Sequence, residues 1–185
     1  MSLRFLPNAI CVARMVLVAP LVWCIVEQRY SIALLLLIVA ALSDGLDGFL
    51  AKTFDWQTRL GGLLDPAADK LLLVSVFVAL GLTRLVPLEL VGIVVARDAL
   101  IVLGAISYQL LVAPVRGEPS SISKLNTACQ LAVVFFTLTH AAFAWPPRVS
   151  LVVLGAAVVF TSIVSGLNYV LRWGARAWRI SHEIG

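Results

Sequence analysis

The chain has 185 residues, of which 61% are hydrophobic and only 13% are charged, and its mean hydropathy is +1.01. A soluble domain is nearer half apolar and a quarter charged, so this composition excludes an ordinary water-soluble fold. The net charge is +4, but no basic stripe is interleaved with aromatic residues. Nucleic-acid binding is therefore not expected.

Six apolar stretches follow one another along the sequence, separated by turn-forming residues such as Gly61-Gly62 and Pro146-Pro147. About 20 residues of helix cross the hydrocarbon core of a bilayer, and in lipid the backbone must satisfy its own hydrogen bonds. We therefore predict an all-α, polytopic membrane protein with one domain over residues 1–185 and a short interfacial segment at the N-terminus. The six predicted transmembrane helices cover approximately residues 8–27, 31–53, 61–82, 87–112, 121–143 and 148–173.

Basic residues are distributed unequally over the two ends of these helices. One end holds Arg4, Lys52, Arg59, Arg116, Lys124, Arg172, Arg176 and Arg179, whereas the other holds only Arg29, Arg84 and Arg148. By the positive-inside rule, the first end and both termini face the cytoplasm. The sequence thus predicts an integral membrane protein, of the bacterial inner membrane, with membrane lipids around it.

Four aspartates lie close together at the predicted cytoplasmic end. Asp44 and Asp47 are spaced i, i+3 near the end of the second helix, and Asp65 and Asp69 are spaced i, i+4 near the start of the third. An antiparallel return of the chain would bring all four together. A single carboxylate at a helix end can reach water, but four that face one another would repel strongly unless cations lay between them.

Hard divalent cations with oxygen ligands resolve this repulsion, and two such ions would cancel four negative charges. Because neither His nor Cys accompanies the aspartates, the pattern favours Mg²⁺ or Mn²⁺ over Zn²⁺. A paired-metal site suits reactions at phosphorus. Gly48, and with less support Gly45, would let a ligand approach the helix backbone, although small residues also pack membrane helices tightly.

These residues resemble the signature of the CDP-alcohol phosphatidyltransferase family. That signature is Asp, two residues, Asp-Gly, two residues, Ala-Arg, eight residues, Gly, three residues, Asp, three residues, Asp. The chain meets every spacing and seven of the eight fixed positions. The matching residues are Asp44, Asp47, Gly48, Ala51, Gly61, Asp65 and Asp69, and Lys52 replaces the arginine.

The resemblance implies transfer of a phosphatidyl group from CDP-diacylglycerol to an alcohol, with release of CMP, by a homodimer. By analogy, the four aspartates would be the metal ligands, and Asp69 would also be the general base. Gly48, Ala51, Lys52 and Gly61 would line the nucleotide pocket. Lysine can neutralise a phosphate but cannot make the planar two-point contact of a guanidinium, so Lys52 weakens the expected nucleotide contact.

Three segments, "LPNAICVARMVLVAPLV", "LDPAADK" and "SKLNTACQ", resemble the branch of the family that acts on glycerol-type acceptors. Within it, "ISKLNTACQL" at 122–131 and "ARDAL" at 96–100 favour phosphatidylglycerol as the acceptor and cardiolipin as the product. Asn126 stands where a second lysine would serve a dianionic acceptor. Glycerol 3-phosphate remains the alternative.

Further polar residues lie inside the predicted helices. Arg97 and Asp98 are deep in the fourth helix, where Arg97 would bind a substrate phosphate beside Lys124, or form a structural ion pair with another helix. Asn8 and Arg14 in the first helix are ligand-binding candidates as well, although capping and snorkelling explain them equally.

A non-catalytic membrane protein that carries divalent cations is the competing class. Its pathway would need acidic groups on both sides of the membrane. All four aspartates lie at one side, and Asp98 alone does not make a pathway. The sequence therefore favours an enzyme.

Overall fold

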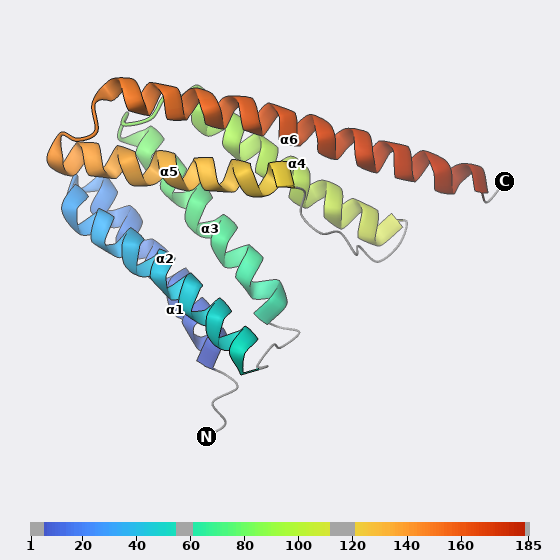
Figure 1. The fold of residues 1–185 in the computed structure, drawn as a ribbon, viewed down its shortest axis with the longest axis horizontal. Coiled ribbons are helices and arrows are strands. Elements are labelled where there is room, and N and C mark those ends of the chain that lie inside the picture. The colour runs from blue at the N-terminus through green and yellow to red at the C-terminus, as the bar shows by residue number, and fades with distance from the viewer. Residues whose placement is uncertain (1–5, 55–60, 112–120, 184–185) are drawn as a thin grey trace. The chain divides into compact units, whose positions relative to one another are not determined.

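The computed structural model describes residues 6–54, 61–111 and 121–183, and this part of the chain consists of α-helices joined by short turns (Figure 1). The all-α prediction is confirmed. Five helices match their predicted ranges to within two residues, and the sixth continues ten residues beyond its predicted end. The helices are α1 (Leu6–Val26), α2 (Tyr30–Thr53), α3 (Gly61–Leu82), α4 (Leu88–Leu111), α5 (Ser121–Phe143) and α6 (Arg148–Glu183).

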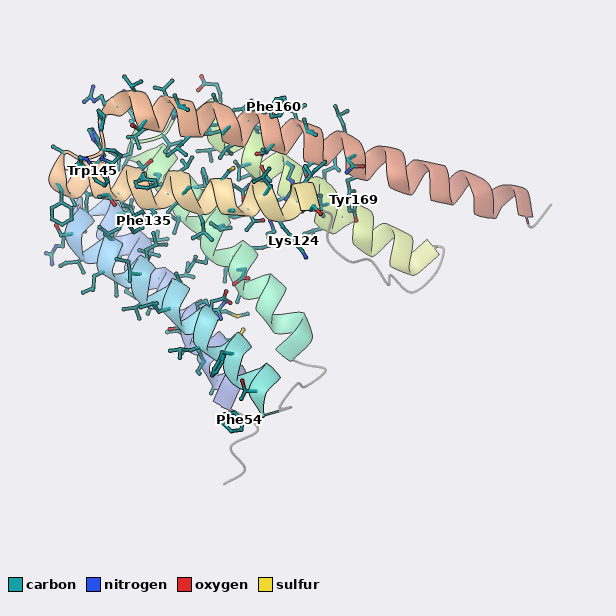
Figure 2. The ribbon with its side chains drawn as sticks, viewed as in Figure 1. Phe54, Lys124, Phe135, Trp145, Phe160 and Tyr169 are labelled. Atoms are coloured by element: carbon teal, nitrogen blue, oxygen red, sulfur yellow. The ribbon has the colours of Figure 1, made fainter. Side chains whose placement is uncertain are left out.

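Three of these helices contain stretches long and apolar enough to cross a membrane, within the part of the chain that is described: Ala9–Val26, Ser121–Phe143 and Arg148–Tyr169. A shorter apolar helical stretch covers Tyr30–Leu46. Large apolar side chains are exposed on them, as at Phe160 (68%, labelled in Figure 2) and Val16 (67%). Such surfaces suit lipid better than water. The chain is a membrane protein, and six crossings stay a prediction.

Two of the turns are closed by non-glycine residues in the left-handed conformation. Gln28 has φ 59° after α1, and Arg84 has φ 57° after α3. The backbone N–H that follows each residue bonds back to a carbonyl of the last helical turn, Arg29 to Cys24 at 2.8 Å and Leu85 to Leu80 at 3.0 Å. These bonds satisfy carbonyls that a helix end otherwise leaves unpaired.

The described helices belong to two compact units, Met1–Leu88 with Val134–Leu151, and Glu89–Val133 with Val152–Gly185. In the first unit α1 packs against both α2 and α3, and Leu21, Leu37 and Phe77 are buried. In the second unit, buried apolar residues of α4, α5 and α6 such as Val94, Val133 and Val158 accompany an unusual number of buried polar ones. A single domain over the whole chain stays a prediction.

Candidate active site

The carboxylates of Asp44 and Asp69 are brought together in the first unit by a single arginine. Asp44 lies on α2, Asp69 lies on α3, and α1 packs against both helices. From α1, Arg14 places its Nη1 atom 2.5 Å from Oδ1 of Asp44 and 2.5 Å from Oδ1 of Asp69. The structure therefore joins two of the four predicted metal ligands.

Burial is very different on the two sides of these ion pairs. The Arg14 side chain is 1% exposed, whereas those of Asp44 and Asp69 are 48% and 46% exposed. A charge this deeply buried is costly unless it is paired. Arg14 therefore does not reach the membrane surface by snorkelling, which was one sequence-based explanation. It is an internal counter-ion for the aspartates, and the carboxylates remain accessible from outside.

The chemistry of this site fits a divalent cation. Because both Oδ1 atoms lie 2.5 Å from one nitrogen, they are at most about 5 Å apart and face the same point in space. A positive group already occupies the gap, so the site is built to hold positive charge between carboxylates. The donors are oxygens, as Mg²⁺ and Mn²⁺ prefer.

Asp47 and Asp65 lie on α2 and α3 as predicted, so the i, i+3 and i, i+4 spacings do place each pair along one helix face. Their side chains lie outside the described residues, so convergence of all four carboxylates stays a prediction. Among the side chains that are described, no group of three or more His, Cys, Asp or Glu is close enough to hold a metal.

The predicted nucleotide-binding residues are placed on helices, but their side chains also lie outside the described part. Gly48, Ala51 and Lys52 belong to the C-terminal part of α2, Gly61 is the first residue of α3, and Asn8 belongs to the first turn of α1. Gly45 is described: a Cβ built there would meet nothing within 4 Å. Among the described residues, close helix packing therefore gives no reason for Gly45, and space for a ligand is consistent with it.

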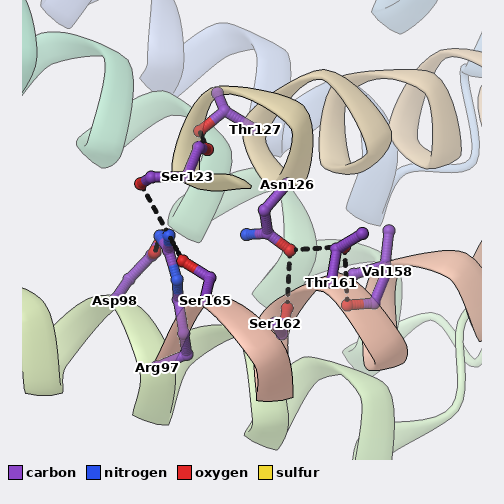
Figure 3. Close-up of polar contacts among 9 residues, drawn as sticks. All are labelled: Arg97, Asp98, Ser123, Asn126, Thr127, Val158, Thr161, Ser162 and Ser165. Atoms are coloured by element: carbon purple, nitrogen blue, oxygen red, sulfur yellow. Dashed lines mark hydrogen bonds and ion pairs between the residues drawn. The ribbon is translucent and has the colours of Figure 1, made fainter. Parts of the chain in front are cut away.

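Arg97 is the centre of a second polar cluster, in the other unit (Figure 3). Its Nη1 atom donates to Oδ1 of Asp98 at 2.6 Å, and both side chains are 4% exposed. Its Nη2 atom donates to Ser123 Oγ on α5 at 2.7 Å and to Ser165 Oγ on α6 at 2.6 Å. The ion pair of Arg97 is thus with its sequence neighbour and not with another helix, and the guanidinium joins α4, α5 and α6.

Lys124 follows Ser123 on α5 and is exposed near the start of that helix (Figure 2). Lys124 is therefore the sequence neighbour of Ser123, whose hydroxyl bonds Arg97.

Several residues of this cluster were not singled out from the sequence. Ser123 and Ser165 bind Arg97, and the hydroxyls of Thr161 and Ser162 lie 2.8 Å and 2.9 Å from Oδ1 of Asn126. One signal was available, because Thr161, Ser162 and Ser165 form a polar strip in an otherwise apolar stretch of α6. Serine and threonine in membrane helices commonly mark interhelical hydrogen bonds.

A comparison with known families decides the relationship. The sequence profile described as CDP-alcohol phosphatidyltransferase matches residues 4–164. The chain belongs to the CDP-alcohol phosphatidyltransferase family. Members of this family generally depend on divalent cations.

Relatives of this chain carry two kinds of name. The chain is 31% identical over 180 residues to the cardiolipin synthase (CMP-forming) of Homo sapiens, with 89% of the chain and 60% of the relative covered. It is 32% identical over 186 residues to a chloroplastic CDP-diacylglycerol–glycerol-3-phosphate 3-phosphatidyltransferase of Oryza sativa subsp. japonica, with 91% and 56% covered. The corresponding enzyme of Aquifex aeolicus is 33% identical over 126 residues, with 65% and 68% covered. The chain spans about 60% of the length of the first of these relatives.

Proposed function

We propose that the chain transfers a phosphatidyl group from CDP-diacylglycerol to phosphatidylglycerol, which yields cardiolipin and CMP. The observation that carries this proposal is the pair of accessible carboxylates, Asp44 and Asp69, held around one buried positive group. Family membership supports the reaction class. The names of several relatives support the acceptor, because they are cardiolipin synthases of the CMP-forming type.

In this reaction the oxygen of an acceptor hydroxyl forms a bond to the phosphorus that carries the diacylglycerol. The bond from that phosphorus to the bridging oxygen of CMP breaks, and CMP leaves with the bonding electrons. We assign Asp69 as the general base that takes the hydroxyl proton. Its carboxylate is half exposed and oriented by Arg14, so it is both accessible to a substrate and fixed in direction.

Asp44, Asp47, Asp65 and Asp69 would hold two Mg²⁺ or Mn²⁺ ions. When bound, such ions neutralise diphosphate oxygens and stabilise the charge of the leaving group. Gly48, Ala51, Lys52 and Gly61 would bind the cytidine nucleotide, and Asn8 in the first turn of α1 would contact a substrate.

The acceptor phosphate would bind at Arg97 and Lys124. Arg97 keeps a rigid orientation through Asp98, Ser123 and Ser165, and its Nε atom is buried without a hydrogen-bond partner among the described residues. Lys124 is exposed one residue from Ser123 and can supply the mobile charge. A rigid guanidinium and a flexible ammonium together suit a lipid phosphodiester.

Glycerol 3-phosphate is the second candidate acceptor. The relatives from Oryza sativa and Aquifex aeolicus that are named for glycerol 3-phosphate favour it. Against it, Asn126 is neutral and buried where another cation would help to bind a dianion. In either case the active site and both termini would face the cytoplasm of a bacterial cell, and the enzyme would act as a homodimer.

Purified protein supplied with CDP-diacylglycerol and Mg²⁺ or Mn²⁺ tests the proposal, with each acceptor offered separately and the lipid products resolved by thin-layer chromatography. We expect cardiolipin from phosphatidylglycerol and no product from glycerol 3-phosphate. Formation of phosphatidylglycerophosphate instead of cardiolipin would show that glycerol 3-phosphate is the acceptor, and the proposed reaction class would stand. Absence of CMP release with every alcohol would overturn the enzymatic function and favour a cation-binding membrane protein.

A further inference from the structure

Two amide side chains are completely buried on one face of α5 within the second unit. Asn126 and Gln130 are both 0% exposed, and their i, i+4 spacing places them one above the other on the helix. Charged or amide groups are rarely buried to this degree unless their hydrogen bonds are satisfied. The hydrogen-bond partners of both amides therefore decide whether this burial is satisfied.

Asn126 is satisfied at one end only. Its Oδ1 atom lies 2.8 Å from the Thr161 hydroxyl and 2.9 Å from the Ser162 hydroxyl, both on α6. The opposite end of the amide, Nδ2, is buried and has no partner among the described residues. If the amide were flipped, the oxygen would be the unpaired atom in place of the nitrogen, and one end of the side chain would still lack a partner among the described residues. In Figure 3 that end is directed to the side of the cluster on which the Arg97 guanidinium lies.

Gln130 is unsatisfied at both ends. Neither its Nε2 atom nor its Oε1 atom has a hydrogen-bond partner among the described residues, although both are buried. Together the two amides present three unpaired ends on one helix face. A donor or acceptor that is buried unpaired destabilises a protein, and a water molecule or a ligand usually accounts for it.

The chemistry of the unpaired groups indicates the kind of ligand. Amides offer N–H donors and a C=O acceptor but no charge, and the one cation close to Asn126 in Figure 3, Arg97, is already paired with Asp98. A hydroxyl group both donates and accepts, so it complements a pair of amides better than a second anionic phosphate does. Resting on the proposed function, we propose that Asn126 and Gln130 form a subsite for the hydroxyl groups of the acceptor's glycerol headgroup.

The test uses the 185-residue chain in phosphatidylcholine nanodiscs and the variants Gln130→Met and Asn126→Leu, which keep side-chain volume but remove the amide. A matched control is Thr139→Val, because Thr139 is a buried polar residue of the same helix and, among the described residues, its hydroxyl donates only to the backbone of its own helix, at Phe135 O. In the wild type and each variant, KM is measured for phosphatidylglycerol, for glycerol 3-phosphate and for CDP-diacylglycerol.

We expect each amide variant to raise KM for the acceptor that the wild type uses by about tenfold, the effect of losing one good polar contact. KM for CDP-diacylglycerol and kcat should change less than about twofold. Thr139→Val should change none of them. The acceptor whose KM rises identifies the source of the glycerol group, lipid or free phosphate ester.

Thermal unfolding gives a readout that does not need activity. Phosphatidylglycerol added to the nanodiscs should raise Tm of the wild type more than phosphatidic acid with the same acyl chains does, because phosphatidic acid lacks the glycerol headgroup. The Tm shifts with glycerol 3-phosphate and with inorganic phosphate are compared in the same way. In Gln130→Met the two ligands of each pair should shift Tm equally. An unchanged KM for the acceptor in Gln130→Met, together with an unchanged difference between the two lipid-induced Tm shifts, would overturn the proposed subsite. A change in Tm without added lipid does not affect this result, because removal of an unpaired amide can raise Tm and loss of a bound water can lower it. A wild type that shows the lipid-dependent shift but releases no CMP would overturn the proposed reaction and keep the subsite.

Discussion

The Nη1 atom of Arg14 lies 2.5 Å from Oδ1 of Asp69, and the same nitrogen lies 2.5 Å from Oδ1 of Asp44. A buried guanidinium thus occupies the position between two carboxylates where a metal ion would otherwise be attracted. Arg14 and a divalent cation would compete for these oxygens, because each oxygen is stabilised by either positive charge. Arginine cannot lose its proton, so this competition does not disappear at any physiological pH.

Arg14→Met should therefore bind Mn²⁺ more tightly than the wild type, by about tenfold if one full charge contact is relieved. The metal-free variant should also have a lower Tm, because Asp44 and Asp69 then repel each other. Mn²⁺ affinity can be measured by electron paramagnetic resonance of the free ion. Arg29→Met is the control, since Arg29 is exposed and the change in net charge is the same. Equal or weaker Mn²⁺ binding in Arg14→Met would mean that Arg14 organises the ligands and does not compete with the metal.

Asp69→Asn should abolish turnover without unfolding the protein. The amide keeps the size of the side chain but cannot accept the proton of the acceptor hydroxyl, and loss of a general base lowers kcat by about 10²–10⁴-fold. CMP release and Tm are measured together. The control is Glu27→Gln, which makes the same acid-to-amide change at an exposed residue of the same unit, and it should leave both CMP release and Tm unchanged. Near-native turnover in Asp69→Asn would remove Asp69 as the base.

Lys52→Arg restores the residue that the family signature carries at this position. A guanidinium can contact a phosphate at two points where an ammonium contacts it at one, so KM for CDP-diacylglycerol should fall by about threefold to tenfold. KM for the acceptor serves as the internal control and should not change. A rise in KM for CDP-diacylglycerol would show that the α2 helix has adapted to lysine and that the signature position is not equivalent here.

Asp98→Asn should destabilise the second unit strongly. The Arg97 and Asp98 side chains are each 4% exposed, and removal of one partner leaves the other charge buried without its counter-ion. Such losses amount to about 3–5 kcal/mol in buried pairs. Tm in detergent should fall clearly, whereas Glu89→Gln, an exposed acid in the first turn of the same helix, should change it little. Similar small shifts in both variants would contradict a structural role for the Arg97–Asp98 pair.

Two glycines of α4 provide a paired test of helix packing in the same unit. A Cβ at Gly104 would lie 3.2 Å from Cε1 of Tyr169 on α6, whereas a Cβ at Gly92 would meet nothing within 4 Å. Alanine gains about 1 kcal/mol over glycine within a helix. We expect Gly92→Ala to raise Tm. Gly104→Ala should not raise it, because the close contact with Tyr169 offsets the higher helix propensity of alanine. A higher Tm in Gly104→Ala than in Gly92→Ala would show that α4 and α6 do not pack closely there.

Most of the helix pattern could be predicted from the sequence, because long apolar stretches bounded by Gly61 and Pro87 leave little freedom in where helices begin and end. The sixth helix continues ten residues beyond the end of its predicted transmembrane range. Its polar C-terminal part is rich in arginine and tryptophan and contains no proline that would end a helix, so α6 continues to Glu183.

The site was only partly predictable. Spacing along α2 and α3 identified the aspartates, since i, i+3 and i, i+4 relations are local. The contacts of Arg14 reach across 30 and 55 residues, and no local pattern specifies such a pairing. Gln130 was missed for the same reason: a lone polar residue in an apolar helix does not show whether it is buried until its neighbours are known.

The proposed phosphatidyl transfer depends on the four aspartates. Its most direct test is CMP release from CDP-diacylglycerol by the wild type and by the Asp44→Asn, Asp47→Asn, Asp65→Asn and Asp69→Asn variants, with phosphatidylglycerol and Mg²⁺ or Mn²⁺ present and again with the metal chelated. We predict acceptor-dependent CMP release by the wild type, loss of it on chelation, and a large fall in each variant that remains folded. CMP release that persists without metal, or in all four variants, would contradict this account of the site.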